Sequence, residues 1–239
     1  MTTVPGYLQD FGAYEKEVAS IYDTLQQASD PIELAEGLPT YLGQGADFCV
    51  FRSQDNPNAV IKLPITESAA YPEEVIETHA QAHILGRQIL GLEQMLTYSP
   101  LRLRSVICKY VPGQELYDLP EGLFQNIPTG HLADLLDTYE AMQDRGLATD
   151  EPINTLYDSR TGLTIIDYKY DPTQTLQDKI VEFSGDIGLI WNKTGGVTLT
   201  PAALAFKGLC GERFGRAMAV AIEEAWPVMF KSYAPKGTA

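Results

Sequence analysis

The stretch that decides the fold, Gly146–Tyr170, reads G-L-A-T-D-E-P-I-N-T-L-Y-D-S-R-T-G-L-T-I-I-D-Y-K-Y. Within it, residues 163–166 form a short apolar strand pattern that follows a Ser-Arg-Thr-Gly turn. Asp150 and Asn154 precede this strand, and Asp167 follows it directly. Magnesium takes carboxylate and amide oxygens as ligands, together with phosphate oxygens and water. The stretch therefore predicts a nucleotide and metal site, with simple turn formation by these residues as the alternative.

The composition is that of a globular protein, with 44% hydrophobic and 21% charged residues in a chain of 239. This length suits one large domain or two small lobes. No run of 18 apolar residues occurs, and no signal-peptide pattern opens the chain, so we expect neither a membrane span nor secretion. Cys49, Cys108 and Cys210 are odd in number and widely spaced, which predicts neither a disulfide framework nor a zinc motif. We expect a cytoplasmic protein.

The formal charge of -15, from 17 basic and 32 acidic residues, favours some classes of partner over others. Nucleic-acid binding normally needs a basic stripe that displaces counterions, and the sequence has none. Membrane surfaces are disfavoured for the same reason. A cationic acceptor, such as a basic peptide or an aminocyclitol, would be attracted by this field.

A glycine-containing turn between two strands is predicted in the first half of the chain. Residues 41–51 have strand character around Gly43 and Gly45, and a second strand follows at residues 59–63. Such glycines let a backbone approach phosphates closely. A dinucleotide fingerprint would need a helix directly after the glycines, whereas another strand follows here. The turn is therefore expected to lie over phosphates as a flap.

Lys62 lies within the apolar strand that follows this flap, where it could reach phosphate oxygens. The alternative is an edge residue in solvent. A phosphate-binding lysine needs an acid that holds it. The next segment, residues 73–88, has a helical pattern, and Glu77 is the expected partner, with Glu74 as runner-up.

Two histidines on the same predicted helix, His79 and His83, are four residues apart and could in principle bind a metal together. No third ligand or intervening Glu accompanies them in the sequence. We therefore interpret them as packing or surface residues.

The remaining chain gives coarser signals. Residues 90–98 and 103–110 have strand patterns, and Pro112 and Gly113 break the second one. From Leu132 onward the pattern is helical. Thr200-Pro201 has the pattern of a helix cap and predicts one or two closing helices over residues 202–230.

Four pieces of this sequence, in order, resemble the protein kinase superfamily, whose two-lobed fold is shared with aminoglycoside and other small-molecule phosphotransferases. Residues 43–50 look like its glycine-rich loop, and residues 59–62 look like the strand whose lysine holds the α and β phosphates of ATP. Residues 109–116 resemble the hinge. Residues 154–167 resemble the catalytic-loop amide and the metal-binding Asp of the D-F-G element, at the interval of the family.

The resemblance implies particular contacts to ATP. Adenine would bind the backbone near Lys109 and Val111, Cys108 would be the gatekeeper, and Glu115 would lie near the ribose. The residues expected to bind ATP are Gly43, Gly45, Val50, Lys62, Cys108, Lys109, Val111 and Glu115.

The resemblance also implies that Asn154 and Asp167 hold Mg²⁺, that Lys62 and Glu77 anchor ATP, and that Asp150 orients or deprotonates an acceptor hydroxyl. The sequence departs from the family at Asp150, which stands one residue closer to Asn154 than the usual Asp and has no His before it. The D-F-G element has become Asp-Tyr-Lys.

The implied fold is α+β and two-lobed and kinase-like: residues 1–111 form a small antiparallel-sheet lobe with a helix, and residues 112–239 form a reduced, mainly helical lobe. The implied function is ATP- and Mg²⁺-dependent transfer of the γ-phosphoryl group to a hydroxyl, preferably of protein Ser or Thr. The alternatives are a small-molecule kinase, a pseudokinase that binds without transfer, and an enzyme that transfers AMP. A bacterial, phage or delivered effector protein would fit each of them.

Overall fold

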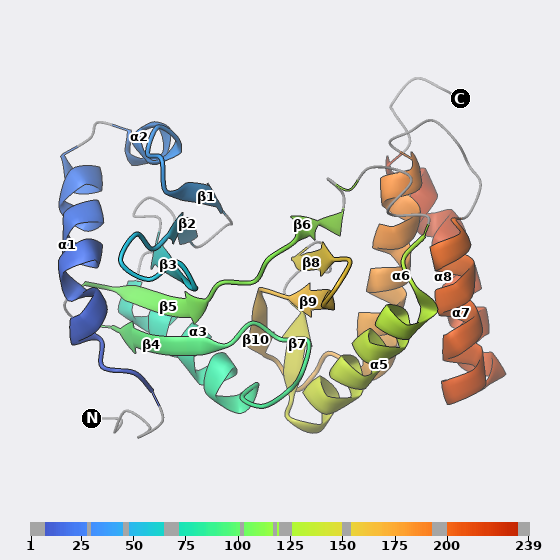
Figure 1. Cartoon of the computed structure of the whole chain (residues 1–239). Helices are drawn as coiled ribbons and strands as arrows, with labels where there is room; N and C mark the ends of the chain where they lie inside the picture. Colours follow the sequence, from blue (N-terminus) through green and yellow to red (C-terminus); the bar gives the residue numbers. More distant parts are fainter. Residues whose placement is uncertain are drawn as a thin grey trace. The chain divides into compact units, whose positions relative to one another are not determined.

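The computed structural model describes residues 8–27, 30–44, 48–64, 72–100, 103–116, 119, 126–149, 154–192 and 200–233 (Figure 1). These residues form an α+β structure with seven helices and a five-stranded antiparallel sheet. The chain divides into two compact units, residues 1–87 with 93–110 and residues 88–92 with 111–239. Among the described helices, none combines the length and the apolar character that crossing a membrane requires.

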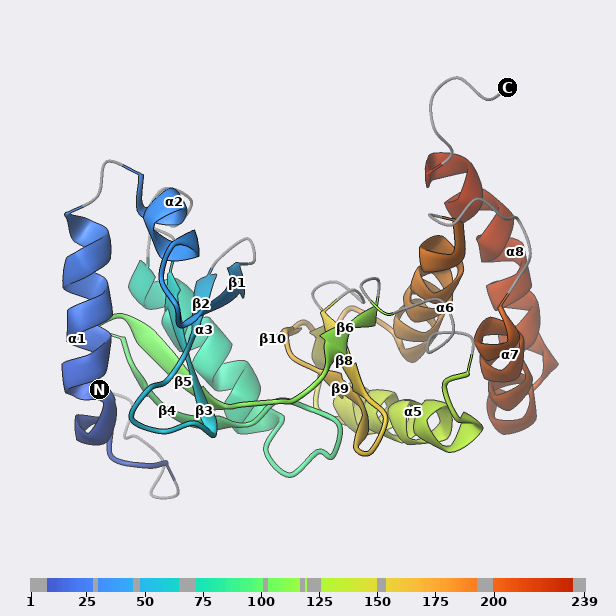
Figure 2. The ribbon, with the colours of Figure 1, turned by 45° about the horizontal axis from the view of Figure 1, so that its top comes forward.

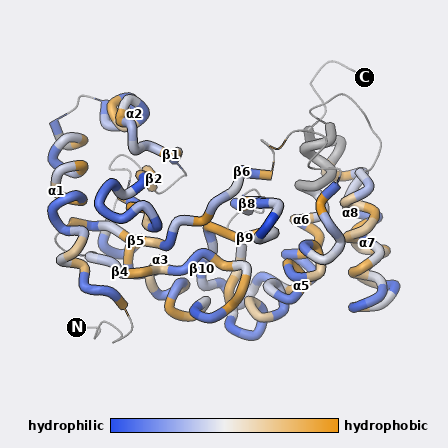
Figure 3. Tube along the Cα trace, viewed as in Figure 1, coloured by the Kyte–Doolittle hydropathy of each residue, from blue (hydrophilic) through white to orange (hydrophobic). Residues whose placement is uncertain are grey.

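The first unit contains the five-stranded sheet, whose strand order is β1-β2-β3-β5-β4. Its strands are β1 (Tyr41–Gln44), β2 (Phe48–Arg52), β3 (Ala59–Pro64), β4 (Met95–Ser99) and β5 (Ser105–Lys109). Polar residues at 53–58 form the turn between β2 and β3, which is one of the hydrophilic segments in Figure 3. The central strand β3 is buried along almost its whole length, because helices cover both faces of the sheet.

Three helices pack on this sheet: α1 (Gly12–Gln26), α2 (Pro31–Glu36) and α3 (Pro72–Leu85). On one face, α1 and α2 contact alternate residues of the strands, including Phe51, Ile61 and Ile107. On the opposite face, α3 contacts the intervening residues, including Val60 and Cys108 (Figure 2). The two sets follow the period of two that a β-strand imposes on its side chains.

The second unit begins with short strands. These are β6 (Gln114–Glu115), β7 (Leu147–Thr149), β8 (Thr155–Asp158), β9 (Gly162–Ile165) and β10 (Tyr168–Tyr170). They form a three-stranded sheet in the order β6-β8-β9 and an antiparallel pair of β7 with β10. The β8–β9 hairpin closes through Asp158, whose side chain accepts the backbone N–H groups of Arg160 and Thr161.

Four helices complete the second unit: α5 (Thr129–Asp144), α6 (Leu176–Asn192), α7 (Pro201–Phe214) and α8 (Arg216–Tyr233). Edge-to-face rings join three of them, with centroids 6.1 Å apart for Tyr139 and Phe183 and 5.0 Å apart for Phe183 and Phe206. Residues 88–92 pack on this unit, since the Gly91 carbonyl accepts the N–H of Ile165 at 2.8 Å.

Several local expectations are confirmed and others are corrected. Thr200 caps α7 by accepting the N–H of Ala203, as Thr200-Pro201 predicted. The strand expected over residues 90–98 is wrong in its first part, because residues 88–92 belong to the second unit and β4 begins only at Met95. The residues of α6 were not predicted as a separate helix.

Candidate functional site

Lys62 lies on the central strand β3 and is buried. Its Nζ is 2.6 Å from Oε2 of Glu93, which follows α3 and is buried as well. Burial raises the pKa of the Glu93 carboxyl, and the ammonium of Lys62 opposes that shift. Lys62 points to the α3 face, because the residues on either side of it, Ile61 and Leu63, belong to the other core.

A row across the sheet joins three of the residues expected to bind ATP. Gly43 of β1 is the cross-strand partner of Val50 in β2, and Val50 is the partner of Lys62 in β3. Directly opposite residues of neighbouring strands lie close together on the same face. Gly45 lies outside the described residues.

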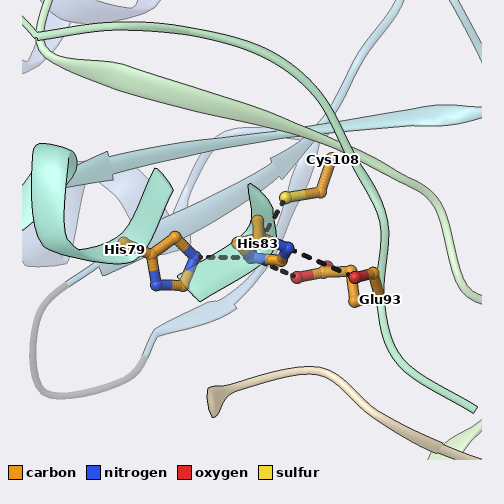
Figure 4. A group of neighbouring side chains, drawn as sticks. All are labelled: His79, His83, Glu93 and Cys108. Carbon is orange, nitrogen blue, oxygen red and sulfur yellow. Dashed lines mark hydrogen bonds and ion pairs between the residues drawn. The ribbon is translucent and has the colours of Figure 1, made fainter. Parts of the chain in front are cut away.

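A buried cluster of His79, His83, Glu93 and Cys108 adjoins this lysine (Figure 4). Nε2 of His83 lies 3.0 Å from Nε2 of His79, 3.7 Å from Oε2 of Glu93 and 3.9 Å from Sγ of Cys108. The four ligand atoms all lie within 4.8 Å of one another. Two nitrogens, one oxygen and one sulfur thus converge, from α3, from the segment after it, and from β5.

Both histidines are held in the neutral form. The pKa of His83 is lowered to about 3, mainly by burial and also by the neighbouring Lys62 cation, while the hydrogen bond to the Glu93 backbone acts in the opposite direction. Burial also lowers the pKa of His79 strongly, with contributions from His83 and Lys62. Neutral imidazoles are the form that binds metal ions.

The acid that the structure places against Lys62 is Glu93, whereas the expected partner was Glu77. Ile76, His79 and His83 lie on the buried side of α3. Glu77 follows Ile76 in the sequence and is exposed. Glu93 takes the place that Glu77 was expected to fill.

Of the two roles expected for the histidines, packing agrees with the structure, since both are buried. Glu93 and Cys108, which are distant in the chain, lie next to them, and the four residues together could hold a metal ion. The sequence contained a signal that Glu93 and Cys108 are buried. Glu93 is the single acid in the apolar stretch I-L-G-L-E-Q-M-L, and Cys108 lies in an apolar strand.

The residues of the expected hinge are divided between the units. Lys109 ends β5 with an exposed side chain, and its N–H donates to the Gln94 carbonyl at 2.7 Å. Val111 and Glu115 are half-buried residues of the second unit.

In the second unit, Asn154 and Asp167 lie at the same end of the β8–β9 hairpin. The carbonyl of Asn154 accepts the N–H of Ile166, the residue before Asp167, at 2.9 Å. Both residues are half-buried. The structure therefore brings Asn154 and Asp167, an amide and a carboxylate residue, to one end of the β8–β9 hairpin.

The expected acceptor-orienting residue, Asp150, lies outside the described residues. The residue before it, Thr149, pairs with Tyr168, the residue after Asp167, in the β7–β10 ladder. The chain segments on both sides of residues 150–153 are therefore fixed next to Asp167.

No protein-family model matches this chain, and no curated protein is significantly similar to it in sequence.

Proposed function

We propose that this protein is an ATP- and Mg²⁺-dependent phosphotransferase with a two-lobed, protein kinase-like fold. The observation that carries the proposal is the buried Lys62–Glu93 pair on the central strand, in one cross-strand row with Val50 and Gly43. In protein kinases a lysine of the third strand binds phosphates and is held by an acid. The same combination on a small antiparallel sheet, with α3 on the face that carries the lysine, supports the same use here.

The first unit would bind the nucleotide. The Lys62 ammonium would neutralise phosphate oxygens, and Glu93 would orient it. Gly43 suits an approach of phosphates to the backbone, since no described residue other than its chain neighbours lies within 4 Å of the place where a Cβ would stand. Lys109, Val111 and Glu115 remain the proposed contacts to adenine and ribose.

The second unit would hold the metal. Asn154 and Asp167 offer one amide and one carboxylate oxygen, a set that fits Mg²⁺, which takes few protein ligands. When bound, Mg²⁺ would neutralise charge that develops on the transferred phosphoryl group. The backbone is held at both residues, since Asp167 lies between β9 and β10 and the carbonyl of Asn154 accepts the N–H of Ile166, which supports their proposed use as ligands.

The acceptor is proposed to be a hydroxyl, preferably of protein Ser or Thr, oriented by Asp150. A small cationic molecule is the second choice, because the net charge of -15 attracts cations. The cysteines Cys49, Cys108 and Cys210 are buried and are not joined in disulfides, which supports a reducing compartment such as the cytoplasm.

Isotope transfer tests the proposal. The protein is incubated with Mg²⁺ and either γ-labelled or α-labelled ATP, in the presence of basic proteins or of aminoglycosides. Transfer of the γ label alone supports the phosphotransferase. Transfer of the α label would assign the protein to AMP transfer instead. ATP binding without movement of either label would make it a pseudokinase and would overturn the proposal.

A further inference from the structure

We propose that His79, His83, Glu93 and Cys108 form a binding site for one transition-metal ion of the zinc class, buried in the first unit. This site is separate from the Mg²⁺ site proposed at Asn154 and Asp167, and it does not depend on the phosphotransferase activity.

The spacing of the ligand atoms fits a tetrahedral ion. Metal bonds of about 2.0–2.1 Å to nitrogen and oxygen and about 2.3 Å to sulfur place the ligand atoms of a tetrahedron roughly 3.3–3.6 Å apart. The three distances from His83 Nε2, of 3.0, 3.7 and 3.9 Å, lie close to these values (Figure 4). Small side-chain rotations would bring all four ligands to bonding distance.

The hydrogen bonding of His83 points its lone pair at the cluster. Its Nδ1 lies 3.2 Å from the carbonyl oxygen of Glu93, which only accepts hydrogen bonds. Nδ1 therefore carries the proton, and Nε2 presents a lone pair toward His79, Cys108 and the Glu93 carboxylate. A backbone carbonyl that fixes the tautomer in this way is the usual support of a metal-binding histidine.

The chemistry of the ligands selects the ion. Imidazole and thiolate ligands favour Zn²⁺ and related transition metals, whereas Mg²⁺ and Ca²⁺ take oxygen ligands. The Cys108 thiolate and the Glu93 carboxylate would neutralise a divalent ion. Lys62 donates to Oε2 of Glu93 and would share this carboxylate with the ion, so its positive charge would oppose the binding of the ion.

Four protein ligands leave no open position, so the role is structural. The ion would fasten α3, through His79 and His83, to β5, through Cys108. This assignment changes one expectation, because a Cys108 thiolate that binds the ion would not be the gatekeeper contact to adenine.

The alternative is a metal-free network in which His79 Nε2–H donates to His83 Nε2. Cobalt distinguishes the two, because thiolate-bound tetrahedral Co²⁺ has intense visible bands and a sulfur-to-cobalt charge-transfer band. The full-length protein is stripped with a chelator and titrated with Co²⁺. We expect saturation at one ion per chain and loss of the bands when Zn²⁺ is added.

Variants assign the ligands. Cys108→Ser should remove the charge-transfer band, and His83→Gln should weaken Co²⁺ binding at least tenfold. Cys49→Ser is the matched control, since this cysteine is also buried in the first unit but lies outside the cluster, and it should keep the wild-type spectrum. Asp167→Asn should bind Co²⁺ normally even where phosphotransfer is lost, so the two proposals fail separately.

The wild-type titration is decisive even if a variant does not fold. No saturable tetrahedral spectrum in the wild type, or a charge-transfer band that persists in folded Cys108→Ser, would overturn the metal site.

Discussion

Nζ of Lys62 and Oε2 of Glu93 lie 2.6 Å apart, although the two residues are 31 positions apart in the sequence. Both side chains are buried, with 8% and 4% of their surface exposed. The same Glu93 oxygen is 3.7 Å from His83 Nε2. One carboxylate thus adjoins both the proposed phosphate-binding lysine and the proposed metal ligands.

Glu93→Gln should destabilise the protein by roughly 3 kcal/mol, because it removes the negative partner of a buried ion pair. Urea unfolding measures this free energy. Glu77→Gln is the matched control on exposed surface of α3 and should change the free energy of unfolding by less than about 0.5 kcal/mol. Equal effects of the two substitutions would contradict the assignment of Glu93 as the partner of Lys62.

Lys62→Met should abolish phosphotransfer and strengthen metal binding. The substitution keeps most of the side-chain volume but removes a cation 2.6 Å from a proposed ligand oxygen. Loss of that repulsion should raise the affinity for Co²⁺ by at least about tenfold. Spectroscopic titration of the wild type and the variant measures the change, and a weaker affinity in the variant would show that Lys62 does not act on the ion in this way.

The start of α6 predicts a pH effect on stability. Thr175 donates its N–H and its hydroxyl to Oδ2 of Asp178 at 2.8 and 2.7 Å, and the N–H of Asp178 donates back to Thr175 Oγ1 at 3.2 Å. This is a capping box. The hydroxyl of Thr175, and then its backbone N–H, lower the pKa of Asp178.

The pKa of Asp178 is lower in the folded state than in the unfolded state. The stabilisation that its ionised carboxylate gives to the fold is therefore fully present above the unfolded pKa of about 3.9, and it is lost as the pH falls through the folded pKa. Asp178→Asn should therefore lower the free energy of unfolding near neutral pH, and the difference from the wild type should shrink in strong acid. Urea unfolding near neutral pH and in strong acid measures the free energy of unfolding of the wild type and of the variant. If the two proteins differ by the same amount at both pH values, the ionisation of Asp178 does not contribute to stability in this way.

Residues 88–92 should depend on a glycine for their packing on the second unit. Gly91 has a φ of 80°, and a Cβ there would lie 2.4 Å from Oγ1 of Thr138. That hydroxyl donates to the carbonyl of Leu90 or of Asp134, so it is not free to move away. Gly91→Ala should cost about 1–3 kcal/mol of unfolding free energy, measured by urea unfolding.

Gly208 provides the contrast. It is exposed within α7, and no atom lies within 4 Å of a built Cβ. Gly208→Ala should stabilise the protein by about 0.5–1 kcal/mol, because alanine is the better helix former. Equal losses of unfolding free energy in Gly91→Ala and Gly208→Ala would contradict the packing assigned to residues 88–92.

The sequence predicted those parts of the fold that depend on local signals. The cap at Thr200, the strands around Lys62 and the hairpin that precedes Asp167 follow from nearby residues. Nearby residues could not predict that residues 88–92 belong to the second unit, because this depends on hydrogen bonds of Leu90 and Gly91 to residues that are distant in the sequence.

The candidate site was predictable to the same degree. Lys62, Asn154 and Asp167 were recognisable from short motifs, whereas the choice of Glu93 over Glu77 depends on which side of α3 faces the sheet. The same rotation of the helix buries His79 and His83 next to Cys108. A helical period fixes which residues share a face, but only packing decides which face is buried.

Transfer of label from γ-labelled ATP in the presence of Mg²⁺, by the wild type and by Asp167→Asn, tests the central claim most directly. Asp158→Asn, at the turn end of the same hairpin, is the matched control. We predict transfer by the wild type and by Asp158→Asn, and a loss of more than about a hundredfold in Asp167→Asn. Transfer that survives in Asp167→Asn at the wild-type rate, or no transfer by a wild type that binds ATP, would contradict the account.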